Sequence, residues 1–178
     1  VEPWDPAAAL ESAGWQGHPF GESPLVGMFA GRAFTFRYPE TTEMLVAAGF
    51  RVVDVDPLTD RRLPDGIQGL YLGGGFPQMH ATDLETNSEL ADDVRSHAEA
   101  GMPIVAECAG LLYLCRHLDG HEMAGVLPMD AAMAKRLTMG YRVATRASIS
   151  VVGHEFHRTT TPPLADLDPA WHITMPDG

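Results

Sequence analysis

Cys108 is the residue best placed to do chemistry in this chain, because the sequence around it predicts a buried strand that turns directly into a helix. Residues 103–106 form a short apolar run after a turn signal. Apolar side chains then recur at helical spacing, at Leu111, Leu112, Cys115 and Leu118. A tight strand-to-helix turn lifts its central residue out of the sheet, as in a nucleophile elbow.

The predicted turn has a chemical consequence for Cys108. The dipole of the following helix would stabilise a thiolate, which is the nucleophilic form of cysteine. Free N–H groups in the first helical turn can bind an oxyanion. The alternative is a buried and unreactive cysteine, as most free cysteines are. The turn alone leaves both alternatives open.

Three consecutive glycines at residues 73–75 follow a predicted strand at residues 69–72. They lack the spacing of a phosphate-binding loop, and Lys135 is the only lysine, so nucleotide binding is disfavoured. Because glycine has no Cβ atom, its N–H group can approach a ligand closely, which makes this loop a candidate oxyanion donor. A plain tight turn is the alternative.

A pair of histidines occurs in Gly-His-Glu-Phe-His at residues 153–157, after a β-branched run. On a strand, Glu155 and His157 would share one face, and His154 and Phe156 the other. A histidine brought to the same sheet edge as Cys108 would act as general base, taking the thiol proton. Metal binding by the pair is disfavoured, because the two rings point to opposite faces and Cys108 is the only thiolate offered.

Length and charge exclude several classes of protein. The chain has 178 residues, which suits one domain, and its net charge of −12 argues against a nucleic-acid or anionic-membrane surface. The two cysteines, Cys108 and Cys115, lie seven residues apart, no disulfide is expected between them, and the compartment should be reducing. Without a spanning stretch or signal pattern, the expected location is cytoplasmic.

Short apolar runs alternate with helical patterns along the middle of the chain. Strands are expected at residues 25–30, 52–55, 69–72 and 103–106. Thr41 or Thr42 is expected to cap the first helix, and Thr82 with Glu85 to form a capping box. This alternation predicts an α/β fold with three layers, α/β/α, around a mostly parallel sheet. Ligands then bind beyond the carboxyl ends of the strands, where Cys108 and the glycines lie.

The ends of the chain are expected to lie outside the domain. Residues 1–24 and 159–178 have the composition of a linker and a C-terminal tail around a domain at residues 25–158. Residues 115–148, rich in methionine and alanine, are expected to connect the elbow helix to the histidine strand and to pack in the core.

Six motifs occur in a fixed order: Ala-Phe-Thr-Phe-Arg-Tyr-Pro-Glu (33–40), Tyr-Leu-Gly-Gly-Gly-Phe-Pro (71–77), Ala-Glu-Cys-Ala-Gly-Leu-Leu-Tyr-Leu (106–114), Ala-Gly-Val-Leu-Pro (124–128), Met-Gly-Tyr-Arg (139–142) and Gly-His-Glu-Phe-His (153–157). Together they resemble the glutamine amidotransferase domain of cobyrinic or hydrogenobyrinic acid a,c-diamide synthase, a class I domain of the CobB/CobQ type. The last motif favours this branch over cobyric acid synthase.

The resemblance implies a class I, flavodoxin-like glutaminase fold. Cys108 would attack the side-chain carboxamide of glutamine, giving a thioester and ammonia, with His157 as its base. The N–H groups of Ala109 and of Gly74 or Gly75 would hold the oxyanion. An ATP-dependent synthetase domain would use the ammonia to amidate the a and c carboxylates of the corrin ring. No cofactor is expected in this domain, because ATP and Mg would belong to the synthetase domain.

Four positions depart from the family pattern. At the elbow, Ala109 stands where glycine is commoner, which a main-chain donor tolerates. Gly31 stands where relatives commonly have aspartate, and Gln78 stands where they have glutamate. Triad amidotransferases carry an acid two residues after the histidine, but this chain has Thr159, so Glu155 is the candidate orienting acid. Two alternatives therefore stay open: a weakened module that only docks to a synthetase, and a different cysteine hydrolase on the same scaffold.

Overall fold

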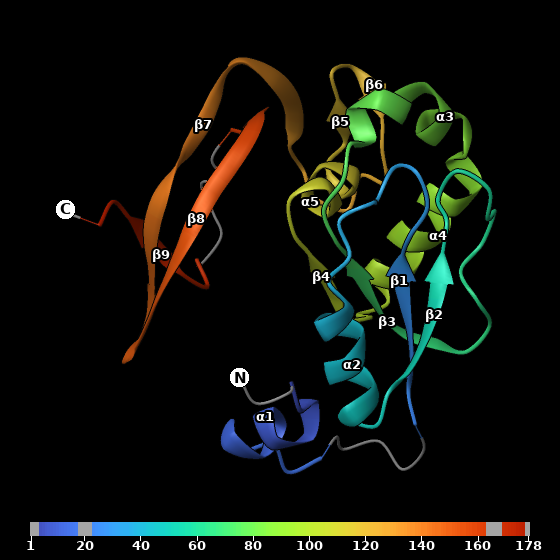
Figure 1. The fold of residues 1–178 in the computed structure, drawn as a ribbon. Helices are drawn as coiled ribbons and strands as arrows, with labels where there is room; N and C mark the ends of the chain where they lie inside the picture. Colours follow the sequence, from blue (N-terminus) through green and yellow to red (C-terminus); the bar gives the residue numbers. More distant parts are fainter. Residues whose placement is uncertain (1–3, 18–22, 163–168, 177–178) are drawn as a thin grey trace.

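The computed structural model describes residues 4–17, 23–162 and 169–176, which form two sheets and the helices around them (Figure 1). The first sheet is parallel, with strand order β2-β1-β3-β4. Its strands are β1 (Leu25–Phe29), β2 (Arg51–Val55), β3 (Ile67–Leu72) and β4 (Ile104–Ala106). Each lies within two residues of the range expected from hydrophobic patterning, so those four predictions are confirmed.

Helices cover both faces of this sheet. They are α1 (Pro6–Ser12), α2 (Pro39–Ala47), the short η1 (Pro77–His80), α3 (Ala81–Thr86), α4 (Ser88–Glu99) and α5 (Ala109–Leu114). On one face, Thr42 of α2 lies 3.5 Å from the sulfur of Met28. On the other, the ring of Tyr113 from α5 packs edge-on against Phe29, with centroids 5.2 Å apart. The three-layer α/β/α fold is thus confirmed.

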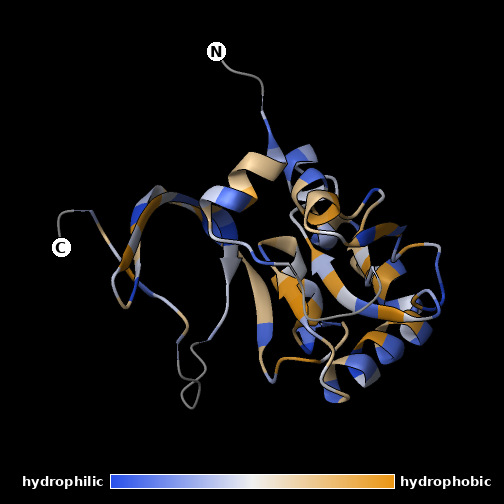
Figure 2. Cartoon of the chain, turned by 90° about the horizontal axis from the view of Figure 1, so that it is seen from below, coloured by the Kyte–Doolittle hydropathy of each residue, from blue (hydrophilic) through white to orange (hydrophobic). Residues whose placement is uncertain are grey.

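The core lies mainly on the face covered by α4 and α5. Phe29, Phe34 and Tyr113 are buried and meet one another edge to face, with ring centroids 5.1 to 6.1 Å apart. The α4 helix adds the fully buried Leu90 and Val94, which lie four residues apart on one helical stripe. Figure 2 shows hydrophobic residues concentrated on the strands and inward helix faces of this main body. The core therefore supports the end of β4, where Cys108 follows.

Two helix starts differ from the expectation. The α2 helix begins at Pro39, so neither Thr41 nor Thr42 caps it; proline is favourable there because the first helical turn needs no N–H donor. The expected capping box of α3 does not form. The carboxylate of Glu85 instead accepts hydrogen bonds from the ring of His121 at 2.8 Å and from the Glu122 amide at 2.9 Å. The start of α2 is thus decided by a local proline, whereas Glu85 is drawn away by partners from a distant part of the sequence.

The second sheet is built from the residues after α5. Its strands are β5 (His117–Leu118), β6 (His121–Glu122), β7 (Asp130–Arg146), β8 (Ile149–Thr160) and β9 (His172–Thr174). Their order is β6-β5-β7-β8, and β9 pairs with β7. The antiparallel hairpin of β7 and β8 projects away from the main body in both views (Figures 1 and 2).

The segment at residues 115–148 is the largest error of the sequence-based fold. The elbow helix ends at Leu114, so Cys115 and Leu118 do not continue it, and half of the segment is the long strand β7. The expected core packing is confirmed before β7, where Cys115, Leu118, Met123, Ala124 and Met129 belong to the core. It is wrong for β7 itself, where only Ala131 is buried. Alanine and methionine carry weak strand signals, and the ladder to β8 overrides their helical preference.

The proposed domain limits at residues 24 and 158 stay a prediction. Some residues outside these limits have regular structure: α1 packs against α2, and β9 adds to the second sheet. Within the ranges that the structure describes, no helix is long and apolar enough to span a membrane.

Candidate active site

Cys108 is the second of the two residues between β4 and α5, and it occupies the N-cap position of α5. Its backbone has φ +51° and ψ −111°, a conformation that residues with a side chain rarely adopt. Such strain persists only where neighbouring structure holds it. The thiol is exposed. The structure therefore has the sharp strand-to-helix turn, with an accessible sulfur, that the sequence pattern predicts.

The glycine loop after β3 lies directly beside this corner. The Glu107 amide donates to the Leu72 carbonyl at 3.0 Å, and the Gly110 amide donates to the Gly73 carbonyl at 3.0 Å. A Cβ atom on Gly110 would lie only 2.3 Å from the Leu72 oxygen. The contact between the two loops thus depends on the absence of a side chain at Gly110.

The glycines at 74 and 75 also have a packing role. The Phe36 amide donates to the Gly74 carbonyl at 3.0 Å, and a Cβ atom on Gly75 would lie 2.2 Å from the Ala33 oxygen. The close approach at Gly75 requires a glycine whether or not a ligand binds, as the tight-turn alternative supposes. Ala109 is fully buried, and in the part of the chain that the structure describes its amide has no hydrogen-bond acceptor among the protein atoms.

The second cysteine is chemically different from the first. Cys115 is fully buried, and its thiol donates to the Leu111 carbonyl at 3.3 Å. Burial, with a contribution from the charge of Asp130, raises the pKa of the Cys115 thiol to about 11. It therefore stays protonated near neutral pH, and Cys108 is the thiol left for nucleophilic chemistry.

His157 and Glu155 share one face of β8, as the strand period predicts. Glu155 Oε1 lies 2.5 Å from His157 Nε2, and the other carboxylate oxygen pairs with Arg142. His157 Nδ1 lies 3.0 Å from the carbonyl oxygen of Thr159. At position 159, where a triad acid is expected, the chain therefore supplies a main-chain oxygen.

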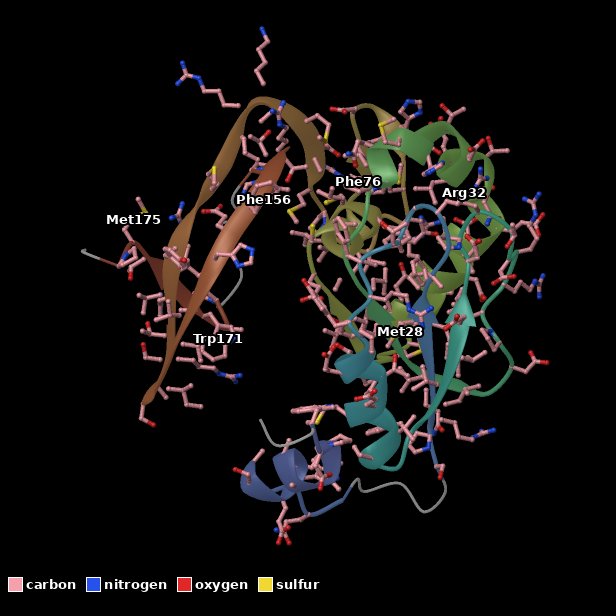
Figure 3. The ribbon with its side chains drawn as sticks, in the orientation of Figure 1. Met28, Arg32, Phe76, Phe156, Trp171 and Met175 are labelled. Atoms are coloured by element: carbon pink, nitrogen blue, oxygen red, sulfur yellow. The ribbon has the colours of Figure 1, made fainter. Side chains whose placement is uncertain are left out.

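The structure does not bring His157 to Cys108. Strand β8 pairs with β7, where His157 is opposite Thr138, rather than with the parallel sheet that ends at Cys108. Figure 3 shows Phe156 with the hairpin and Phe76, beside the glycine loop, with the main body. Both ring nitrogens of His157 have partners on its own strand, and no described residue bonds the Cys108 thiol. Their pairing stays a prediction.

We expect the Glu155–His157 contact to weaken in acid. The hydrogen bond from His157 holds the pKa of Glu155 below its usual range, and Arg142 acts in the same direction. A carboxylate with a lowered pKa stabilises the fold above its unfolded value, about 4.3 for Glu, and this contribution is lost as the pH falls. Glu155→Gln should therefore lower the free energy of unfolding at neutral pH, with a deficit that shrinks as the pH falls below about 4.3. Urea unfolding at several pH values measures this, and a constant deficit would contradict it.

The structure shows the surroundings of two of the residues that depart from the family pattern, Gly31 and Gln78. Gly31 has φ +82°, and a Cβ atom on it would lie 2.3 Å from the carboxylate of Asp56. The Asp56 side chain thus fills the space beside this glycine. Gln78 lies in η1, just after the glycine loop.

Sequence reasoning missed one side-chain pair at the corner. The hydroxyl of Tyr71 donates to Glu107 Oε1 at 2.6 Å, directly before Cys108. A signal was present, because Tyr71 is opposite Val105 in two parallel strands and Glu107 continues the same face two residues on.

Comparison with solved structures shows that other proteins share this fold. A crystal structure titled as a glutamine amidotransferase superposes with a TM-score of 0.56 at 21% identity, over 79% of this chain and 75% of that one. The family model for the CobB/CobQ-like glutamine amidotransferase domain matches residues 26–178. The chain therefore belongs to the CobB/CobQ-like glutamine amidotransferase family.

Curated relatives carry more specific names. The chain is 51% identical over 167 residues to hydrogenobyrinate a,c-diamide synthase of Streptomyces coelicolor, covering 89% of this chain and 34% of that protein. It is 44% identical to the enzyme of the same name in Thermobifida fusca, covering 100% and 40%. A cobyrinate a,c-diamide synthase of Synechococcus is 43% identical, covering 72% and 31%. The chain thus spans about a third to two fifths of the length of these relatives.

Proposed function

We propose that this chain is the glutaminase part of a hydrogenobyrinate or cobyrinate a,c-diamide synthase. The Cys108 thiolate attacks the carboxamide carbon of glutamine, the C–N bond breaks and ammonia leaves, and water hydrolyses the thioester to glutamate. The observation that carries the proposal is the exposed Cys108 on a strained strand-to-helix corner beside the glycine loop. Membership of the amidotransferase family supports glutamine as the substrate.

The oxyanion of each tetrahedral intermediate is held by main-chain amides. Ala109 provides one, because its amide is adjacent to Cys108 and donates to no other described atom. Gly74 or Gly75 provides the second from the adjacent loop. Loss of one such donor typically lowers the rate about 10²- to 10³-fold.

In this proposal His157 is the general base and Glu155 orients its ring. The hydrogen bond of 2.5 Å between them supports the second role. For the first role, the hairpin has to bring His157 to Cys108, and the ring has to release the Thr159 carbonyl that it now contacts. Glu155 keeps the other nitrogen during this exchange.

The ammonia passes to an ATP-dependent synthetase part, which amidates the a and c carboxylates of the corrin substrate. The greater length of the named relatives supports such a part. ATP and Mg belong to that part, and the glutaminase part uses no cofactor. Two unpaired cysteines fit a reducing, cytoplasmic setting.

A glutamine-analogue electrophile tests the proposed nucleophile. It should label Cys108 and not Cys115, as read by peptide mass spectrometry, and glutamine should protect against the label. Failure of labelling even with the synthetase part present would favour a docking module. Labelling by unrelated acyl substrates, without protection by glutamine, would favour a different cysteine hydrolase.

A substitution of His157 tests the base separately. His157→Asn should lower kcat for ammonia release about 10²-fold or more, because general-base catalysis contributes that much. His154→Asn is the matched control, since that side chain points to the opposite face of β8. Unchanged kcat in His157→Asn would assign the base to another residue and leave Cys108 as the nucleophile.

A further inference from the structure

A side-chain hydrogen bond joins β3 to the residue before the nucleophile. The Tyr71 hydroxyl donates to Glu107 Oε1 at 2.6 Å, a length typical of a hydroxyl bound to a carboxylate. Strand register brings the two together, because Tyr71 is opposite Val105 and Glu107 lies two residues further on the same face. The bond therefore ties the carboxyl end of β4 to the neighbouring strand.

The Tyr71 hydroxyl keeps its proton well above neutral pH. Burial of the phenol and its bond to Glu107 raise the pKa of Tyr71 to about 12, so the hydroxyl remains a donor at neutral pH. Among the described residues, Glu107 has no basic partner that competes for its carboxylate. Tyr71 is thus its dedicated side-chain partner.

The bond is made where the backbone is strained. Cys108 has φ +51°, and main-chain hydrogen bonds hold the residues on either side of it: the Glu107 amide to Leu72 and the Gly110 amide to Gly73. The side-chain hydrogen bond from Tyr71 to Glu107 adds to them, and the same hydroxyl also has a hydrogen-bond interaction with Thr41 of α2. The Tyr71–Glu107 bond fixes the exposed side of the turn, which the main-chain bonds leave free.

We infer that Tyr71 and Glu107 are a positioning pair that holds the Cys108 corner in its strained conformation, so that the sulfur faces the carboxamide carbon. This inference rests on the proposed function, since it concerns the geometry of the same nucleophile. Neither side chain touches the reacting atoms. The pair acts through the backbone of residue 108.

Packing of the Tyr71 ring is a separate role that the test has to exclude. The ring lines a cavity of about 390 Å³ whose other walls are Trp4, Glu40, Thr41, Met44, Leu45 and Val105. Tyr71→Phe keeps the ring and removes only the hydroxyl. Glu107→Gln keeps an oxygen acceptor, whereas Glu107→Ala removes it.

The experiment measures glutamine hydrolysis in the full-length protein. Tyr71→Phe and Glu107→Ala should each lower kcat about tenfold and leave KM for glutamine within about twofold, because misplacement affects the attack rather than binding. Glu107→Gln should restore most of the kcat. The double variant should be no slower than either single variant, as expected for two partners in one bond. Tyr141→Phe and Glu43→Ala, which remove exposed groups without described partners, are the controls.

The rate at which iodoacetamide alkylates Cys108 separates this inference from the proposed function. If the wild type hydrolyses glutamine, Cys108→Ala does not, and the Tyr71 and Glu107 variants keep the wild-type kcat, the positioning pair is rejected and the glutaminase stands. If the wild type and Cys108→Ala release ammonia equally, the glutaminase is rejected. In that case the Tyr71–Glu107 positioning pair is supported only if Tyr71→Phe changes the rate at which iodoacetamide alkylates Cys108 while the urea midpoint of unfolding stays that of the wild type.

Discussion

Substitution of Cys108 by alanine is expected to lower ammonia release from glutamine by about 10³-fold or more, because removal of a covalent nucleophile leaves only binding and oxyanion stabilisation. The fold should survive, since the Cys108 side chain is exposed and makes no contact that stabilises the core. The measurement is kcat for ammonia release in the complete enzyme, together with far-UV circular dichroism.

The second cysteine provides the matched control for this result. Cys115→Ala removes a thiol whose pKa is raised to about 11 by burial, so ammonia release should stay within about threefold of the wild type. Cys115 is fully buried, and the variant should lose some stability because a small cavity forms. Equal losses of activity in both variants, or full activity in Cys108→Ala, would reject Cys108 as the nucleophile.

Gly110→Ala is expected to lower the free energy of unfolding by about 3 kcal/mol, at the upper end for a crowded core. In an exposed helix the same change would add about 1 kcal/mol of stability. Here the new Cβ atom would lie 2.3 Å from the Leu72 carbonyl oxygen and 2.6 Å from the Leu72 Cβ. Backbone atoms cannot move aside, so α5 has to separate from β3. Urea unfolding measures the loss.

Gly153→Ala is the control for this clash. Gly153 lies in β8, and an added Cβ atom would meet no heavy atom within 4 Å. The free energy of unfolding of the Gly153→Ala variant should differ from that of the wild type by no more than about 0.5 kcal/mol, as for other surface substitutions. Similar effects at the two glycines would show that the contact between α5 and β3 is not tight. Gly110→Ala should also impair labelling of Cys108, because the corner depends on that contact.

The parallel half of the molecule was predictable because local and global signals agree there. The apolar runs at residues 25–30 and 69–72 are bounded by turn residues, and they became β1 and β3. The corner at Cys108 follows from one short run, one cysteine and the helical spacing after it. The proximity of the glycine loop follows from topology, since parallel neighbours end at the same edge of a sheet.

The antiparallel half was less predictable because its partners are not encoded in local patterns. The strand period correctly placed Glu155 and His157 on one face of β8. It could not indicate that β8 would pair with β7 rather than extend the parallel sheet. The alanines and methionine near residue 132 indicate no strand by themselves, and only the ladder to β8 makes them extended. The role of His157 therefore needs the experiment described above.

The left-handed backbone at Cys108 implies a trade-off between durability and activity at one residue. A glycine at position 108 would adopt φ +51° without steric penalty, and relief of such strain is typically worth about 1 kcal/mol or more. Selection for a sturdier fold alone would favour that replacement, but glycine has no sulfur. If Cys108 is the nucleophile that we propose, this corner is where the domain gives up stability in order to keep the sulfur exposed.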